Sequence, residues 1–157
     1  IKINVLCYSF YFIKWQCLLT LHPKSKIKLK SKLKELTSRS NGYGYEIRKQ
    51  KLKNYIMEWV AYFHLAQIKR LCTETDEWLR RRIRMCIWKS WKNVKTRVSN
   101  LKKCGALAWQ AYQWGNTRLG YWRVANSRLV TSAMSNDKLR RAGYVGLMDC
   151  HLKWCPK

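Results

Sequence analysis

Hydrophobic residues recur at helical spacing through the first half of the chain. Over residues 46–66 an apolar side chain returns every three or four positions, which predicts an amphipathic helix with one face for packing. Residues 24–36 fit both an alternating and a helical pattern, but their length, their lysine content and the preceding proline favour a helix. The small polar residues between them, 37–44, are typical of a turn-forming linker.

A longer segment, residues 73–103, contains no glycine or proline and predicts one long helix or two helices with a bend. Threonines precede Asp76 and Glu77, which indicates an N-cap at Thr73 or Thr75 followed by an acidic first turn. Projection at about 100° per residue predicts a packing face. That face holds Leu79, Ile83, Cys86, Ile87 and Ser90.

The N-terminal residues have a different pattern. Residues 3–13 are apolar, a short polar stretch follows, and residues 17–21 are mostly apolar again, which predicts a β-hairpin within residues 1–22. A membrane-spanning helix takes about twenty apolar residues, so the first run is too short to cross.

The C-terminal part is richer in glycine, tryptophan and small residues. Cys104 and Gly105 indicate a helix end, and short helices are predicted at 106–113, 121–132 and 136–142. The sequence therefore predicts a mainly α fold, in which a helical bundle follows a short β-hairpin and precedes a small helical or irregular tail.

The charge of the chain restricts its partners. Lys and Arg number 33 against 8 Asp and Glu, a formal net charge of +25. Such a charge favours nucleic acid or an anionic membrane, with steep salt dependence. Nine tryptophans interleaved with basic residues suit unpaired bases and RNA. The polar linkers and the lack of a long apolar segment argue against a membrane-binding amphipathic protein.

Basic residues concentrate on the long segment, where Trp78, Trp88 and Trp91 project beside them. Four arginines in five positions repel one another and are not expected to be needed for folding, and few acids are near enough to pair with them. This pattern predicts a polyanion-binding face; the alternative is a solvated helix face. The lysines of residues 24–36 have the same two interpretations, phosphate contact or solvation.

Combining these features gives a set of candidate nucleic-acid contacts. They are Arg39, Arg48, Lys49, Lys51, Arg80, Arg81, Arg82, Arg84, Trp88, Lys89, Lys92, Lys95, Arg97, Lys102, Lys103, Arg118, Arg123 and Arg128. The tail tryptophans Trp109, Trp114 and Trp122 either contact nucleic acid as well or pack the tail against the bundle.

Catalytic motifs are missing from the sequence. A polymerase needs carboxylates that hold two divalent metals, but the three aspartates are isolated and there is no Y-x-D-D. The only tight cluster of metal-ligand types, Cys150, His151 and Cys155, lacks the paired spacing of zinc sites. We expect reduced thiols, no catalytic residue, and no metal or other cofactor in this chain.

Several stretches resemble the maturase-specific, or thumb, domain of bacterial group II intron reverse transcriptases. The resemblance is carried by DEWLRRRIRMCIWKSWK at residues 76–92 and LTSRSNGYGYEIRKQKLKNYIMEWVAYFHLA at residues 36–66. It continues through WGNTRLGYWRVANS at 114–127 and SNDKLRRAGYVGLMD at 135–149, and so covers nearly the whole chain.

The resemblance implies a division of the chain and a set of partners. Residues 1–22 would be a remnant hairpin of the polymerase palm, 24–105 the thumb, and 106–157 a DNA-binding region. Because the chain begins with Ile1, we expect a fragment. Its partners would be group II intron RNA, target DNA and the missing N-terminal polymerase domain, which would hold the divalent metals, in a bacterial cytoplasm.

The expected function is binding of intron RNA to assist splicing and intron mobility. The alternative is a non-specific basic RNA- or DNA-binding protein of the chaperone kind, whose affinity falls steeply with salt for every RNA.

Overall fold

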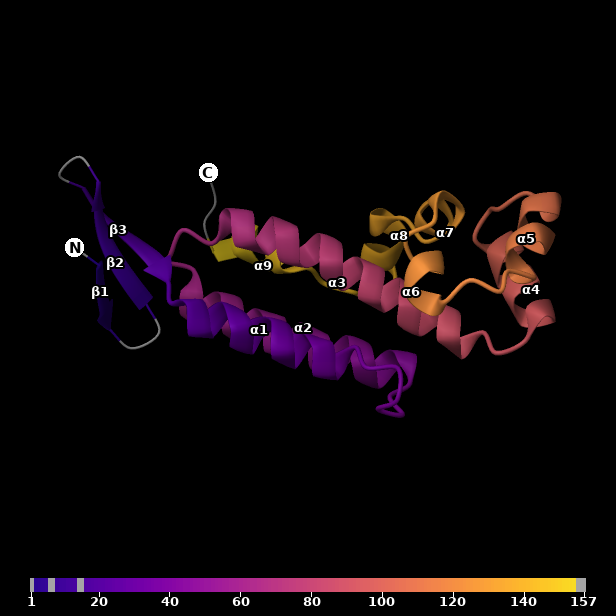
Figure 1. Ribbon diagram of the computed structural model, residues 1–157, viewed down its shortest axis with the longest axis horizontal. Helices are drawn as coiled ribbons and strands as arrows, with labels where there is room; N and C mark the ends of the chain where they lie inside the picture. The colour runs from indigo at the N-terminus through magenta and orange to yellow at the C-terminus, as the bar shows by residue number, and fades with distance from the viewer. Residues whose placement is uncertain (1, 6–7, 14–15, 155–157) are drawn as a thin grey trace.

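A computed structural model describes residues 2–5, 8–13 and 16–154. The fold is mainly α, as the sequence predicts. A small sheet lies at one end of an elongated molecule, α1, α2 and α3 run along its length, and α4 and α5 lie at the other end (Figure 1).

The sheet is antiparallel with the order β1-β2-β3. Its strands are β1 (Lys2–Val5), β2 (Tyr8–Ile13) and β3 (Gln16–Leu21). The pairing of β2 with β3 confirms the predicted hairpin, although its expected turn at residues 14 and 15 lies outside the described residues. The N-terminal apolar run forms two strands rather than one, because it folds back on itself between β1 and β2.

The sheet is attached to the helical part through side chains and backbone. The hydroxyl of Tyr8 donates to the carbonyl of Tyr62, and the amide of Gln67 donates to the carbonyl of Leu19 at 2.9 Å. Leu21 is buried in the main core. These contacts hold β2 and β3 against the end of α2.

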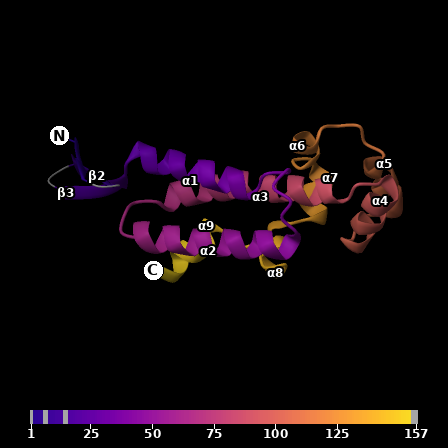
Figure 2. The same ribbon diagram turned by 90° about the horizontal axis from the view of Figure 1, so that it is seen from below.

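Two antiparallel helices follow, α1 (Pro23–Leu36) and α2 (Tyr45–Phe63), and Figure 2 shows them along the same axis as α3. In α1, Leu29 and Leu33 are buried while Ile27 is 69% exposed, which settles the ambiguous pattern in favour of a helix. His22 caps α1 by accepting from the amide of Lys24, and Pro23 occupies a first-turn position that needs no donor.

The predicted apolar face of α2 is buried from Leu52 to Phe63. Ile47, an apolar residue of the same predicted helix that we expected on this face, is exposed instead. Ile47 lies on the outer side of the helix with Lys51 and Glu58, because positions four and eleven residues apart share a face.

The long basic segment forms two helices, α3 (Lys69–Ser90) and α4 (Val94–Lys103), which confirms the predicted alternative with a bend. The predicted N-cap is wrong, because α3 begins at Lys69 and the hydroxyl of Thr73 donates to the carbonyl of Lys69 inside the helix. The helix end at Gly105 is confirmed: Gly105 has a φ of 87°, and the amide of Ala106 donates to the carbonyl of Leu101.

In the tail, the described residues up to 154 form five short helices. They are α5 (Ala108–Gly115), α6 (Tyr121–Val124), α7 (Arg128–Ala133), α8 (Asn136–Arg141) and α9 (Leu147–Trp154). The single helix predicted at 121–132 is divided, because Ser127 leaves the helical conformation and caps α7 by accepting from the amide of Val130. The last helix, α9, was not predicted.

The buried residues that the structure describes form a main core, a second core and a small third cluster of Met85, Cys86 and Ala125. The main core lies between α1, α2 and α3, and the tail adds Leu139, Tyr144, Leu147 and Cys150 to it. The second core surrounds Trp88 and Trp91 with residues of α4, α5 and α7. Both cores draw on residues before and after 105, so the predicted boundary between thumb and tail is not a gap in packing.

Candidate nucleic-acid interface

The arginines of α3 connect that helix to three other parts of the chain. Arg81 donates from Nε and Nη2 to the carbonyl of Trp122 in α6, at 3.2 and 3.0 Å. Arg82 donates to the hydroxyl of Thr37 at 2.6 Å and to the carbonyls of Lys34 and Thr37 at 3.1 Å. Backbone carbonyls thus take the place of acidic partners for these two side chains, which favours a structural role that the sequence did not lead us to expect.

Three of the predicted contacts lie in the interior and cannot present their side chains to a partner in this structure. Arg84 is 7% exposed and donates to the carbonyl of Met134 and to Oδ1 of Asn136, both at 2.8 Å. Arg48 is buried and donates to Oδ1 of Asn41. Trp88 is 1% exposed, because it packs in the second core.

The other predicted contacts remain at the surface to different extents. Half-buried members with a partner in the chain are Lys49, Arg80, Arg81, Arg82 and Arg97. Exposed members are Arg39, Lys51, Lys89, Lys92, Lys95, Lys102, Lys103, Arg118, Arg123 and Arg128. The surface is thus cationic along α3 and α4 and across the tail.

Three segments enclose a hollow of about 370 Å³ at the C-terminal end of α1, which we call the basic pocket. It is lined by Lys34, Ser38, Arg39, Ser40, Arg82, Met85 and Trp122. Among these described lining residues none is acidic. Lys89 also reaches this loop, where its Nζ donates to the carbonyl of Arg39 at 2.7 Å. The pocket offers guanidinium and ammonium groups together with two hydroxyls, which suits an anionic oxygen.

Aromatic rings border the basic pocket and are themselves covered by cations. The guanidinium of Arg81 lies 3.9 Å from the ring centroid of Trp122, and that of Arg39 lies 5.3 Å from the ring of Tyr121. Trp122 nevertheless remains 39% exposed. Cationic groups able to pair with a phosphate and rings able to stack on a base therefore occur side by side.

A protein-family model, "Group II intron, maturase-specific domain", matches residues 26–105. This chain belongs to that family. A search of the curated proteins gives no match. The matched residues include every residue lining the basic pocket except Trp122, so the pocket lies where the maturase-specific domain meets the tail.

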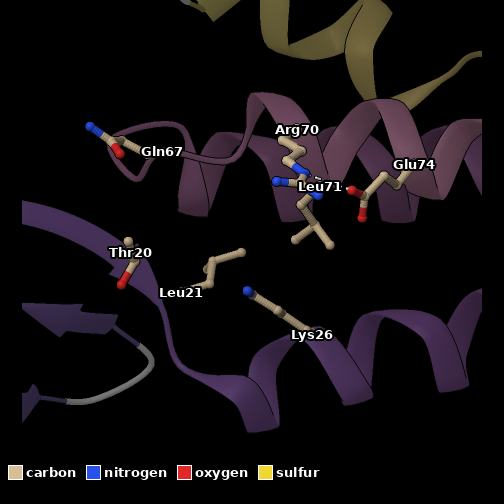
Figure 3. A pocket seen from close by; sticks show the side chains of 7 residues that line it. All are labelled: Thr20, Leu21, Lys26, Gln67, Arg70, Leu71 and Glu74. Carbon is tan, nitrogen blue, oxygen red and sulfur yellow. Dashed lines mark hydrogen bonds and ion pairs between the residues drawn. The ribbon is translucent and has the colours of Figure 1, made fainter.

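Helix α1 of the maturase-specific domain carries lysines that the candidate set did not include. Six are exposed: Lys24, Lys26, Lys28, Lys30, Lys32 and Lys34. Lys26, Lys30 and Lys34 follow one another at four-residue spacing and so form a row along one side of α1. Lys34 lines the basic pocket, and Lys26 projects towards α3 into a second hollow of about 350 Å³ (Figure 3). Regular lysine spacing beside a buried leucine face is the sequence signal for this row.

The C-terminal end of the maturase-specific domain holds a groove of about 470 Å³ between α4 and α5. Lys95 and Lys102, both predicted contacts, line it with Tyr112. Nζ of Lys102 lies 4.5 Å from the ring centroid of Tyr112. Tyr112 was missed in the sequence, because only its position opposite α4 makes it part of a basic surface.

The cysteines of the described residues are free thiols. Burial raises the pKa of Cys72 to about 12, so that thiol stays protonated at neutral pH. Of the weak zinc cluster, Cys150 and His151 are buried on α9, and Cys155 lies outside the described residues. Searching the part of the chain that the structure describes gives no group of three or more metal-ligand side chains and no helix able to span a membrane.

Proposed function

We propose that this chain binds group II intron RNA and so assists splicing and intron mobility. The basic pocket is the observation that carries the proposal. It places Lys34, Arg39 and Arg82 around one hollow beside the partly exposed Trp122, and nearly all of its lining belongs to the family-matched residues. Family membership supplies the kind of RNA, and the pocket supplies the chemistry that would hold it.

The geometry supports a division of roles within the pocket. Arg82 has its hydrogen bonds within the protein, so it contributes positive charge and fixes the shape of the loop. Lys34 and Arg39 are exposed and carry donors that can turn to a phosphate. Trp122 offers a flat apolar surface to an unpaired base.

The first experiment is filter binding of intron RNA and of a shuffled RNA of equal length across a salt series. We expect the native chain to prefer intron RNA and to keep that preference as salt rises, because shape-dependent contacts are less screened than bulk charge. Arg39→Ala should lower the affinity for intron RNA several-fold and reduce the salt slope by roughly one.

Arg70→Ala is the matched control for Arg39→Ala. It also removes one arginine charge, but the Arg70 side chain is 93% exposed, pairs with Glu74 and lies outside the basic pocket. Equal losses in the two variants would show that only total charge counts, and would contradict a specific role for the pocket.

Non-specific binding of RNA or DNA is a second candidate function, and α1 favours it. Its six lysines are exposed, and Lys32 is paired with Glu35 at 2.9 Å. Such a helix attracts any phosphate backbone. Superimposed curves for intron and shuffled RNA across the salt series would favour this candidate.

We further propose that the chain contributes binding rather than catalysis and that residues 106–157 contact target DNA. The exposed Arg118, Arg123 and Arg128 in the tail support the second statement. The absence of a Y-x-D-D sequence supports the first.

A further inference from the structure

A hollow of about 400 Å³ separates α5 from α7 in the tail, beyond the residues that match the family. We call it the tail pocket. It is lined by Trp109, Gln110, Gln113, Trp114, Arg128, Leu129 and Ser132. Its size is at the lower end of the range for small-molecule sites, which suits one small planar group.

The two indoles of the tail pocket differ in their surroundings. Trp114 packs against the second core, so its ring is a fixed wall of the pocket. Trp109, five residues earlier, is 64% exposed and is not part of any core cluster. A large aromatic ring held at the surface beside a fixed one leaves apolar area that a flat ligand can cover.

The polar groups of the tail pocket are amides, one hydroxyl and one guanidinium. Gln110 and Gln113 each carry a donor and an acceptor, the combination that reads the edge of a nucleobase. Arg128 is exposed at the first position of α7 and supplies a positive charge for a neighbouring phosphate. None of the described residues that line the pocket is acidic.

We propose that the tail pocket receives one unpaired nucleobase of a single-stranded nucleic acid. The base lies against Trp109 and Trp114, the two glutamines contact its edge, and Arg128 contacts the adjoining phosphate. An apolar peptide would leave both amides and the guanidinium without partners, which costs free energy, and the net charge of +25 favours a polyanion. The inference rests on the proposed function, since charge elsewhere on the chain brings the strand to the pocket.

The test compares two labelled oligonucleotides by fluorescence anisotropy on the full chain. One carries uracil at every position, and the other has the same sugar-phosphate backbone without bases. We expect the native chain to bind the uracil strand at least about fivefold more tightly, since stacking on an aromatic residue gives roughly that factor or more per base. Trp109→Ala should remove most of this difference and leave the affinity for the baseless strand unchanged.

Two further variants separate stacking from folding. Trp109→Phe keeps an aromatic ring and should retain most of the preference. Trp154→Ala removes another exposed tryptophan, which lies on α9 beside His64 and outside the tail pocket. This variant should behave as the native chain does. Ribose and deoxyribose versions of the strand show whether the base comes from RNA or from DNA. A loss of affinity with Trp109→Ala on either backbone supports the pocket.

Three results would overturn the proposal. They are equal binding of the uracil and baseless strands by the native chain, equal losses in Trp109→Ala and Trp154→Ala, and a loss in Trp109→Ala that is as large on the baseless strand. Failure of the pocket is distinguishable from failure of the proposed function, because the preference for intron over shuffled RNA is measured separately on the native chain, in which Trp109 is unchanged.

Discussion

Lysine and arginine have different positions in this chain, although both contribute to its charge. All the basic residues of α1 are lysines, and all are exposed. On α3, by contrast, Arg81, Arg82 and Arg84 donate to carbonyls of other segments. A guanidinium has five donors in a rigid fork and stays charged when partly buried, so it suits half-buried links between helices better than an ammonium group does.

Replacement of Arg84 tests this structural role at the scale of one residue. Arg84→Ala leaves the buried carbonyl of Met134, and also Oδ1 of Asn136, without the guanidinium that donates to both. We expect the free energy of unfolding to fall by about 2–3 kcal/mol in urea denaturation. Arg118→Ala removes the same charge from an exposed position and should stay within about 0.5 kcal/mol of the native chain. Equal stabilities for the two variants would refute the structural role.

Residues of one helix face could be assigned from the sequence, whereas long-range polar contacts could not. Leu79, Ile83 and Cys86 are buried as predicted, because helical spacing alone places them on one side. The burial of Arg84 depends on acceptors that lie 50 and 52 residues further along the chain. Periodicity carries no information about such partners. The predicted contacts in the same basic segment therefore include residues that are exposed and others, such as Arg84, that are buried.

At the scale of elements, the ends of helices were predicted less well than their existence. The sequence placed Asp76 in the first turn of α3, but this residue caps another helix. Its carboxylate accepts from the backbone amides of Leu147 and Met148, at 2.7 and 2.9 Å. This carboxylate satisfies the free donors at the start of α9. Gly146 allows the approach, since a Cβ there would lie 2.7 Å from Oδ2 of Asp76. A cap from a distant helix has no local sequence signature, which is why α9 was missed.

The Asp76 cap predicts a particular dependence of stability on pH. Burial raises the pKa of this carboxyl from its ordinary 3.8, against the opposing effect of the two amide donors and Arg80. The folded chain therefore binds the proton more tightly than the unfolded chain. The resulting stability is fully present below pH 3.8 and is lost as the pH rises through the folded-state pKa.

Asp76→Asn isolates this contribution, because the amide keeps an acceptor for α9 but does not titrate. Relative to Asp76→Asn, the native chain should gain stability as the pH falls from neutrality, as measured by urea denaturation at a series of pH values. A gain in the opposite direction, with rising pH, would mean that the amide donors outweigh burial. Asp137→Asn, at an exposed carboxylate, is the control.

At the scale of the whole molecule, the family-matched segment and the tail share their cores. The main core includes Leu139, Tyr144, Leu147 and Cys150, and the second core joins Trp88 and Trp91 to Ala111 and Val130. Composition suggested a boundary at 105, because the tail is richer in glycine and tryptophan. Packing between distant segments does not appear in composition, so this continuity could only be seen in three dimensions.

The shared cores predict that residues 24–105 do not fold cooperatively without the tail. Each large apolar side chain buried from the tail contributes roughly 1.5–3 kcal/mol, and several together approach the total stability of a typical domain, about 5–15 kcal/mol. Residues 24–105 should therefore show helical far-ultraviolet dichroism but a broad thermal transition, whereas residues 24–157 should unfold sharply. A sharp transition in both would show that the tail is an independent unit, and binding measurements could then be made on each part separately.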